Sequence, residues 1–444
     1  MTHFTLTPLL TDEDPMESSE GGIDPLGTEP LADTLAVKLA PGVRERQQHP
    51  RFLTAMAASL SLCDELDDDV VARDGVTEPW LVFEWYVVEG LVRIRGQTPS
   101  EIRGLPGRDK AAQAIADGVP LSAKRYLKTP AIFGFHGIYR LLARTLGIEQ
   151  GEQLGERGYE LLRIWAKEQG IEGFVGTGNG PGRWLREQIV EALRLSLDKS
   201  AVARTNGWTG WNFFSEHLAP YELGRREARF LSDTLLNDTD GSRREVLEFL
   251  ISGKGRQLWL KEVASRRYSE RIFHSALRHR ASADLRRLLL TIDAYERFAR
   301  LVQDAFDDCL YEMTRRSGRV SLKELSRLDS VKLASRNLPQ TAAETIDRLD
   351  SFNLALQFQQ LFGSLGERGT AGQWLERLVE HHFKTQRQKP PDGKMPWFEG
   401  DERGYIIRPL YRRYEQSRRD TSYVHLFRTA SLWSFASDLK MLRQ

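Results

Sequence analysis

A regular apolar repeat over residues 283–316 constrains the fold of this chain more than any other feature of the sequence. Apolar side chains recur there at alternating steps of four and three residues, which keeps them on one face of an α-helix. They are Leu288, Ile292, Tyr295, Ala299, Val302, Phe306, Cys309 and Met313. Further apolar residues widen this face, namely Leu285, Leu289, Phe298, Leu301 and Ala305. Because the face is wider than a two-stranded seam, we expect the spine of an intramolecular bundle rather than a dimeric coiled coil, with residues 342–365 as its partner.

Helical spacing of apolar residues continues through most of the remaining sequence, so the expected fold class is mainly α. Residues 51–66 carry apolar side chains at near-helical steps. Residues 80–94 are apolar on nearly every side, which fits either a buried helix or a central strand. Their length favours the helix, whereas the β-branched residues among them keep the strand open as an alternative.

Residues 133–169 carry the order of elements found in a winged-helix unit. We expect a short helix over His136–Leu146, a polar glycine-containing loop over Gln150–Gly155 and a second helix over Glu156–Trp165. In a winged helix, one helix enters the major groove of DNA and the hairpin-like loop touches the backbone. Helix–turn–helix connections are common in all-α proteins, and many winged helices bind only protein, so these alternatives stay open.

Large aromatic residues gather within residues 205–220. They are Trp208, Trp211, Phe213 and Phe214. Aromatic side chains at this density usually fill a junction between helical layers, which is the structure we expect. A platform on which an unpaired base stacks is the alternative.

These patterns divide the chain into four parts. Residues 1–30 are acidic and have too little apolar surface to offset the entropy of ordering, so we expect a disordered tail. Residues 31–222 are expected to form a helical domain that contains the winged-helix-like unit, and residues 223–389 a helical bundle. Residues 390–444 are expected to form a linker followed by helices rich in Arg and Tyr.

Positive charge is concentrated in residues 254–287, although the chain as a whole carries a net charge of only +1. Ten Lys and Arg residues face three acidic residues in this stretch, and Trp259, Tyr268 and Phe273 stand among them. Cations bind phosphates and flat rings stack on bases, so the combination is typical of a groove for a polyanion. The residues predicted to bind nucleic acid are Lys254, Arg256, Arg266, Arg267, Arg271, Arg278, Arg280, Arg286 and Arg287.

A second, smaller basic cluster lies near the C-terminus. It comprises Arg412, Arg413, Arg418 and Arg419. The arginines of the first stretch cannot all lie on one helical face, because consecutive residues point about 100° apart around a helix. The alternative to nucleic-acid contact is therefore that they pair with acidic residues of this chain or of a partner protein.

The sequence carries no recognisable catalytic motif, and we expect neither a metal nor a cofactor. Cys63 and Cys309 are far apart in apolar segments, which indicates buried thiols rather than a zinc ribbon or a disulfide framework. Polar residues cluster on one predicted helix, namely Glu376, Glu380, His381, His382 and Lys384. They miss the spacing of a zinc-protease helix, so we expect a solvated polar face there, with a carboxylate pair as the alternative.

No stretch of the sequence is apolar enough to cross a membrane, and the acidic N-terminus does not resemble a signal peptide. We therefore expect a cytoplasmic protein without membrane contact.

Short apolar and glycine-containing segments carry a resemblance to known proteins. They are Gly22–Gly27, Leu39–Val43, Pro50–Ala55 and Phe133–Tyr139. These segments resemble uncharacterised helical proteins of bacterial anti-phage defence islands, which are encoded beside helicases and other DNA-processing genes. The resemblance implies a component of a multi-protein, DNA-directed defence system with partners such as a helicase or a nuclease. It supplies no functional residues.

Together, these patterns predict a non-enzymatic, DNA-associating subunit of such a system. A protein-interaction scaffold that binds no nucleic acid is the main alternative. A metal-dependent nuclease is a further alternative, because nuclease cores of this kind leave little trace in a single sequence.

Overall fold

The computed structural model describes residues 24–66, 72–96, 98, 102–176, 178–237, 241–264, 269–316, 318–390, 392–417 and 419–442. Contacts divide the chain into two compact units, each assembled from segments that are distant in the sequence. Unit 1 combines Met1–Leu35, Arg266–Arg278 and Ser282–His425. Unit 2 combines Ala36–Ser265, His279–Ala281 and Leu426–Gln444.

The described residues are mainly helical, which confirms the predicted fold class. Strands occur in them only as two short antiparallel pairs, β1 with β2 and β3 with β4. None of the helices formed by the described residues combines the length and the apolar character needed to cross a lipid bilayer.

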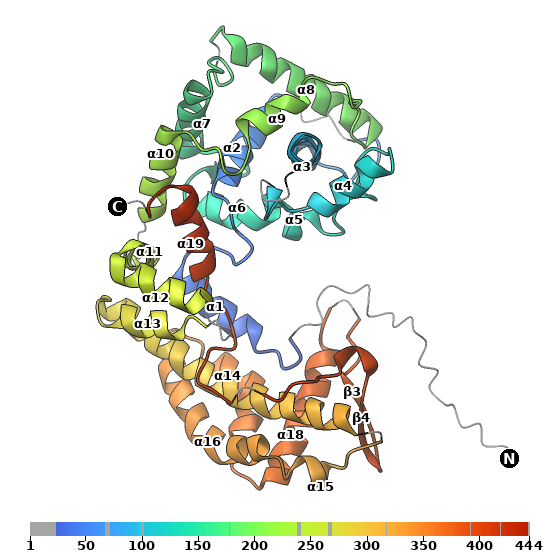
Figure 1. Cartoon of the computed structure of the whole chain (residues 1–444), viewed down its shortest axis with the longest axis vertical. Helices are drawn as coiled ribbons and strands as arrows, with labels where there is room; N and C mark the ends of the chain where they lie inside the picture. Colours follow the sequence, from blue (N-terminus) through green and yellow to red (C-terminus); the bar gives the residue numbers. More distant parts are fainter. Residues whose placement is uncertain are drawn as a thin grey trace, which may run out of the picture. The chain divides into compact units, whose positions relative to one another are not determined.

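Unit 1 is built along the long helix α14 (Ala283–Arg315), as the heptad repeat predicts. All eight residues of the predicted seam are buried, and the side chain of Ser282 caps the first turn by accepting a hydrogen bond from the backbone N–H of Leu285 at 3.3 Å. The helix α16 (Asp329–Asp350) packs along it (Figure 1).

The partner segment predicted over residues 342–365 spans the end of one helix and a second helix. The helix α16 ends at Asp350, and α17 begins only at Ala355. Between them Asn353 adopts a left-handed backbone with φ 58°, which ends the helix. The break turns α17 so that the Phe358 ring meets Phe298 of α14 at 4.7 Å between centroids.

The remaining elements of unit 1 pack on α14, on α16 or on one another. They are α13 (Arg271–Arg278), α15 (Leu322–Leu325), α17 (Ala355–Phe362), η3 (Gly363–Gly366), α18 (Ala371–Arg387), β3 (Phe398–Asp401), β4 (Gly404–Ile407) and η4 (Pro409–Tyr411). In β3 and β4, Phe398 pairs with Ile407 and Asp401 with Gly404. The C-terminal region, for which a linker and helices were expected, thus contains a hairpin that begins at Phe398.

The segment Asp24–Gly27, which the sequence places in a disordered tail, is bound to α18. The ring of His381 donates through Nε2 to the carbonyl of Leu26 at 2.7 Å, and the ring of His382 donates through Nδ1 to the carbonyl of Pro25 at 2.8 Å. Both rings are buried. The prediction for these residues is wrong because their partners lie about 355 positions along the chain. Residues 1–23 of the predicted tail lie outside the described residues.

Unit 2 surrounds the helix α3 (Pro79–Arg95), which Figure 1 shows end-on with other helices around it. Twelve consecutive residues, Leu81–Val92, are buried. A helix buried on every side explains why this segment is apolar all round, and it confirms the helix over the alternative strand.

Besides α3, unit 2 contains further helices and two short strands, some of which pack directly on α3. They are α2 (Arg51–Cys63), α4 (Arg108–Ala116), α5 (Pro130–Phe133), α6 (Phe135–Thr145), β1 (Glu149–Gln150), β2 (Gln153–Leu154), α7 (Glu156–Glu168), α8 (Pro181–Lys199), α9 (Trp211–His217), α10 (Arg225–Leu236), α11 (Ser242–Ile251), α12 (Gly253–Ala264) and α19 (Thr429–Asp438). The helix α1 (Glu29–Leu39) begins in unit 1 and ends in unit 2.

The aromatic segment forms the junction between α3 and α9, as its density predicts. Tyr86 of α3 lies 5.4 Å from Trp211 and 5.9 Å from Phe214 between ring centroids. Gly90 allows the close approach, because a Cβ there would lie 2.9 Å from Cβ of Phe214.

A helix, a hairpin and a second helix follow one another in α6, β1–β2 and α7. The expected polar loop over Gln150–Gly155 contains the hairpin, in which Glu149 pairs with Leu154 and Gln150 with Gln153.

Candidate functional site

The basic residues predicted to bind nucleic acid are distributed over both units. Lys254 and Arg256 lie on α12 and Arg280 follows in unit 2, whereas the others that the structure describes belong to unit 1. Those are Arg271, Arg278, Arg286 and Arg287. Arg266, Arg267 and Arg418 lie outside the described residues.

Several of these residues are engaged within their own unit. Arg271 pairs with Asp293 at 3.3 Å, and Arg287 pairs with Asp284 at 3.1 Å. The guanidinium of Arg256 donates to the carbonyl of Leu442 at 2.7 Å. The guanidinium of Arg286 donates to the carbonyl of Arg278 at 3.2 Å. These contacts are of the internal kind that the sequence offers as the alternative to nucleic-acid contact.

Two arginines of the second basic cluster are held by acidic residues of α14. Arg413 pairs with Asp307 at 2.9 Å, and Arg419 pairs with Asp308 at 2.8 Å. Both aspartates are buried, and burial raises the pKa of Asp307 to about 6 although Arg413 acts to lower it. These two arginines therefore neutralise charge inside unit 1.

Three of the predicted residues are exposed without an acidic partner among the described residues. They are Lys254, Arg280 and Arg412. These are the cations that remain available to a phosphate backbone.

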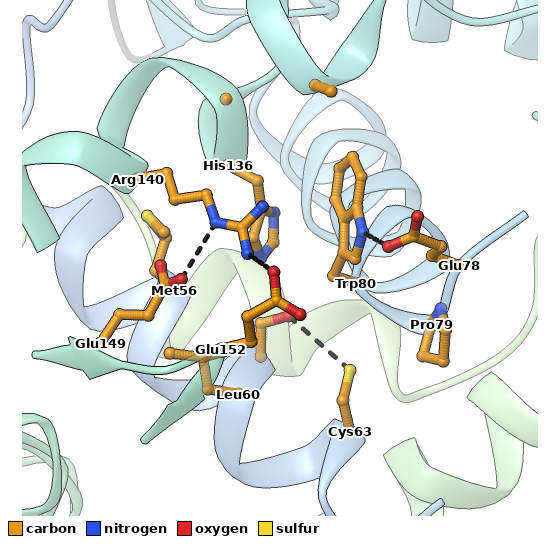
Figure 2. A pocket seen from close by; sticks show the side chains of 13 residues that line it. Met56, Leu60, Cys63, Glu78, Pro79, Trp80, His136, Arg140, Glu149 and Glu152 are labelled. Atoms are coloured by element: carbon orange, nitrogen blue, oxygen red, sulfur yellow. Dashed lines mark hydrogen bonds and ion pairs between the residues drawn. The ribbon is translucent and has the colours of Figure 1, made fainter. Parts of the chain in front are cut away.

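A pocket of about 200 Å³ in unit 2 brings together side chains with chemical capacity (Figure 2). We call it the Trp80 pocket. Three helices each contribute residues four positions apart, the spacing that places two side chains on one helical face. They are Ser59 and Cys63 on α2, Trp80 and Glu84 on α3, and His136 and Arg140 on α6. All except Glu84 line the pocket, and Glu84 lies behind His136.

The carboxylate of Glu84 is fully buried and accepts three hydrogen bonds. The phenol of Tyr126 donates to Oε1 at 2.8 Å, and the backbone N–H of His136 donates to Oε2 at 3.0 Å. The third contact joins Nδ1 of the His136 ring to Oε2 at 3.2 Å. Burial and the nearby carboxylate raise the pKa of Tyr126 well above its usual range, so the phenol remains a donor.

Two glycines make this arrangement possible. A Cβ on Gly134 would lie 2.0 Å from Oε1 of Glu84, and a Cβ on Gly137 would lie 2.2 Å from the carbonyl oxygen of Ala131. Gly134 therefore lets the carboxylate reach the N-terminus of α6, where the backbone N–H groups favour a negative charge. The close packing around Glu84 thus explains why glycines stand on both sides of His136 in the sequence.

One nitrogen of His136 is left for a ligand. Because a carboxylate only accepts, Nδ1 carries the hydrogen in the contact with Glu84, and in the neutral ring Nε2 is an acceptor. This Nε2 atom is buried and has no hydrogen-bond partner among the described residues. The ring centroid lies 4.6 Å from Phe135 and 5.2 Å from Trp80, so aromatic contacts hold its orientation.

The thiol of Cys63 lies in the same pocket but is not activated. Its hydrogen-bond contact is the hydroxyl of Ser59, with 3.9 Å between Oγ and Sγ. Burial of the thiol raises its pKa to about 12, and the Ser59 contact offsets this only in part. A protonated thiol is a poor nucleophile, so the pocket lacks the Cys–His pair of a thiol hydrolase.

A cluster of ion pairs forms the wall of the pocket next to the hairpin. Arg140 pairs with Glu149 at 3.0 Å and with Glu152 at 2.7 Å, and Arg144 pairs with Glu149 at 2.9 Å. Figure 2 shows the Arg140 pairs on one side of His136 and the Trp80 indole on the other. The hairpin acids thereby neutralise the arginines of α6.

The polar residues of α18 do not form a site. His381 and His382 were expected on a solvated face, and this prediction is wrong because both rings are buried and bound to backbone carbonyls. Burial lowers the pKa of His382 to about 4, so its ring is neutral. The described residues contain no group of three or more His, Cys, Asp or Glu side chains placed to hold a metal ion.

Sequence reasoning missed the Trp80 pocket. The residues Phe133–Tyr139 stand out by the winged-helix-like pattern and by their resemblance to other proteins, and neither of these indicates a pocket. Glu84 lies in an apolar run 52 positions before His136. The available signal was a carboxylate inside a segment that is apolar nearly all round, since a buried charge needs partners. The chain matches no family model, no curated protein and no solved structure.

Proposed function

We propose that this protein is a ligand-binding protein whose Trp80 pocket takes a small, flat molecule or group that donates one hydrogen bond. The observation that carries the proposal is the unpartnered Nε2 of His136. A buried polar atom without a partner costs free energy, and a ligand donor would remove that cost.

The other features of the pocket support the same kind of ligand. The indole of Trp80 and the side chains of Met56 and Leu60 give it an apolar surface against which a flat ring packs. Glu84 keeps the imidazole in one orientation, so little entropy is lost when a ligand binds. The protonated Cys63 favours binding over covalent chemistry.

Phenol and toluene test this proposal, because they have nearly the same size and only phenol carries a donor. We expect calorimetry to show binding of phenol, and binding of toluene at least about fivefold weaker, a difference of about 1 kcal/mol. The variant His136→Phe keeps an aromatic ring but removes Nε2, so it should lose the preference for phenol. The matched control is His279→Phe, because His279 is exposed and outside the pocket. Equal binding of the two probes by the unmodified protein would contradict the proposal.

Association with DNA, as a non-enzymatic subunit of a multi-protein bacterial anti-phage defence system, is the second proposal. It is supported by the exposed Lys254, Arg280 and Arg412, which have no acidic partner among the described residues. The order of α6, hairpin and α7 supports a winged-helix-like unit. The ion pairs of Arg271, Arg413 and Arg419 make these three poorer candidates for phosphate contacts.

A gel shift across a salt series tests the second proposal. Removing one phosphate contact should reduce the slope of log affinity against log salt by roughly 0.9 on duplex DNA. We therefore expect a slope lower by roughly two in the double variant Lys254→Ala/Arg280→Ala. Arg229→Ala is the matched control, because Arg229 is 85% exposed and pairs with Asp233 on its own helix.

Absence of any shift at about 50 mM salt would contradict DNA association and favour the protein-interaction scaffold. Cleavage of plasmid by the purified protein with Mg²⁺ or Mn²⁺ would instead favour the nuclease.

A further inference from the structure

A second hollow in unit 2 lies on the other side of α3 and has a different chemistry. Its volume is about 500 Å³, and we call it the Arg204 hollow. The C-terminal half of α3 contributes Glu89 and Arg93. The end of α4 and the turn after it contribute Ala114, Ile115, Gly118, Val119 and Pro120. The segment 202–207, which precedes α9, completes it.

Two arginines of the hollow are held against tryptophan rings. The guanidinium carbon of Arg93 lies 5.0 Å from the ring centroid of Trp211, and that of Arg204 lies 5.4 Å from Trp208. The two indoles meet edge to face at 5.2 Å, and Trp211 donates through Nε1 to the carbonyl of Thr205 at 2.9 Å. The guanidinium groups are therefore fixed by the aromatic core before any ligand arrives.

The charges in this hollow do not cancel. Glu89 accepts from Nε of Arg93 at 2.9 Å and from Nη2 at 2.6 Å, so Arg93 is neutralised. Arg204 has no acidic partner among the described residues, and its Nε is buried without an acceptor. One cation without an acidic partner therefore lies beside the hollow, and an anionic acceptor would satisfy both its charge and its buried Nε.

Apolar side chains form much of the remaining lining. They are Ala114, Ile115, Val119, Pro120, Val202 and Ala203. A volume of this size is typical of small-molecule sites, which combine an apolar surface with a few polar groups that fix orientation. The neighbouring Thr205, Asn206 and Gly207 are exposed, so a ligand can enter past them.

From these observations we infer that the Arg204 hollow binds a small amphiphilic anion, with one carboxylate or phosphate group on Arg204 and an apolar portion against Val119, Pro120 and Val202. Arg204 supplies a planar fork of donors to the anionic oxygens, which is the geometry that both groups accept. Arg93 is already paired with Glu89, so Arg204 is the cation of the hollow that is left for the anionic group. This site is separate from the Trp80 pocket and shares no lining residue with it.

Hexanoate, hexyl phosphate and hexan-1-ol test this inference by calorimetry on the full chain. The first two share an apolar tail and differ in the anionic group, whereas the alcohol is neutral. We expect at least one of the anions to bind at least tenfold more tightly than hexan-1-ol, and comparing the anions decides between carboxylate and phosphate. Equal affinity of all three probes, or no binding of either anion at millimolar concentration, would overturn the inference.

The variant Arg204→Gln should lose at least tenfold in affinity for the preferred anion, and Arg204→Lys should retain part of it, because the charge remains while the planar fork is removed. Arg229→Gln, on an exposed arginine away from the hollow, should bind like the unmodified protein. Near-ultraviolet circular dichroism of each variant establishes that the tryptophan core is intact. A folded Arg204→Gln protein with unchanged affinity would show that the anion binds elsewhere.

Discussion

The carboxylate of Glu84 carries three hydrogen bonds in a place that water does not reach. Tyr126, the backbone of His136 and the His136 ring all donate to it. Hydrogen bonds to a charged group contribute about 1.5–3 kcal/mol each, and a buried donor left without its acceptor costs about 1–3 kcal/mol. The side chain therefore couples the stability of unit 2 to the geometry of the Trp80 pocket.

We predict that Glu84→Gln lowers the free energy of unfolding by about 2–4 kcal/mol, because the amide brings two donors to atoms that themselves donate. Urea unfolding followed by circular dichroism measures the change. Glu187→Gln is the control, since Glu187 is 61% exposed and pairs with Arg183 on the same helix, where about 0.5 kcal/mol is expected. A loss for Glu84→Gln no larger than the control would show that the carboxylate does not carry this network.

Both nitrogens of the buried His382 ring form hydrogen bonds, and its burial determines how the stability of the protein changes with pH. Nδ1 donates to the carbonyl of Pro25, and Nε2 accepts from the backbone N–H of Trp397 at 3.0 Å. Burial lowers the pKa to about 4 from the ordinary 6.5. Between these two values, the unfolded chain binds a proton that the folded chain does not, so stability falls as the pH falls.

We predict that the contribution of His382 is fully present above about pH 6.5 and is lost down to about pH 4, with a total of about 3 kcal/mol. Urea unfolding at about pH 7.5 and about pH 5 should therefore differ by about 2 kcal/mol more in the unmodified protein than in His382→Gln. An equal pH dependence in the two proteins would contradict this prediction. His425 acts in the opposite sense: burial opposes its charge, but Glu296 raises its pKa overall, so its contribution is lost as the pH rises.

At the scale of elements, close contacts between helices depend on single glycines. Gly134 stands before α6 with φ −74°, a backbone that alanine adopts readily. An alanine side chain has no room there, because its Cβ would lie 2.0 Å from Oε1 of Glu84. Gly363 follows α17 with φ −53° and has nothing within 4 Å of an added Cβ.

We predict that Gly134→Ala destabilises the protein by about 2 kcal/mol or more, through overpacking against the carboxylate. Gly363→Ala should instead be neutral or stabilising by up to about 1 kcal/mol, since alanine restricts the unfolded chain. Thermal unfolding of both variants measures the difference. If both substitutions lowered the melting temperature, or both raised it, the tight packing around Glu84 would be contradicted.

The elements that sequence patterns predicted are those defined by local spacing. The helix α14 follows from its heptad repeat, and the helix α3 follows from the length of its apolar run. The break between α16 and α17 did not follow, because Asn353 in a left-handed conformation leaves no mark in the apolar pattern. The hairpin β3–β4 was also missed, since strands of four residues are too short for their alternation to stand out.

At the scale of the whole molecule, the sequence shows how much charge is present but not which groups neutralise it. The cluster of Arg413 and Arg419 suggested a surface for phosphates, yet Asp307 and Asp308 on α14 accept both arginines. These partners lie more than 100 positions away in the sequence. The Trp80 pocket was missed for the same reason, because tertiary packing brings Glu84 to His136.

The attachment of Asp24–Gly27 to α18 predicts unequal effects of two N-terminal deletions. Removing residues 1–27 would leave the buried donors of His381, His382 and Gln386 without their acceptors, at about 1–3 kcal/mol each. We expect the melting temperature of this variant to fall by about 10 °C or more. Removing residues 1–22 should change it by less than about 2 °C. Equal effects of the two deletions would contradict the attachment.

The same attachment has a consequence for the order of events during synthesis. Leu26 is made 355 residues before the His381 ring that binds its carbonyl. At about 5–20 residues per second, roughly 20–70 s pass before that ring exists. Throughout this interval the N-terminal segment is without the helix that holds it, and α19 of unit 2 is made later still. Unit 1 cannot be completed before α18 is made, and unit 2 cannot be completed before α19 is made, so early segments of both units wait for these helices during synthesis.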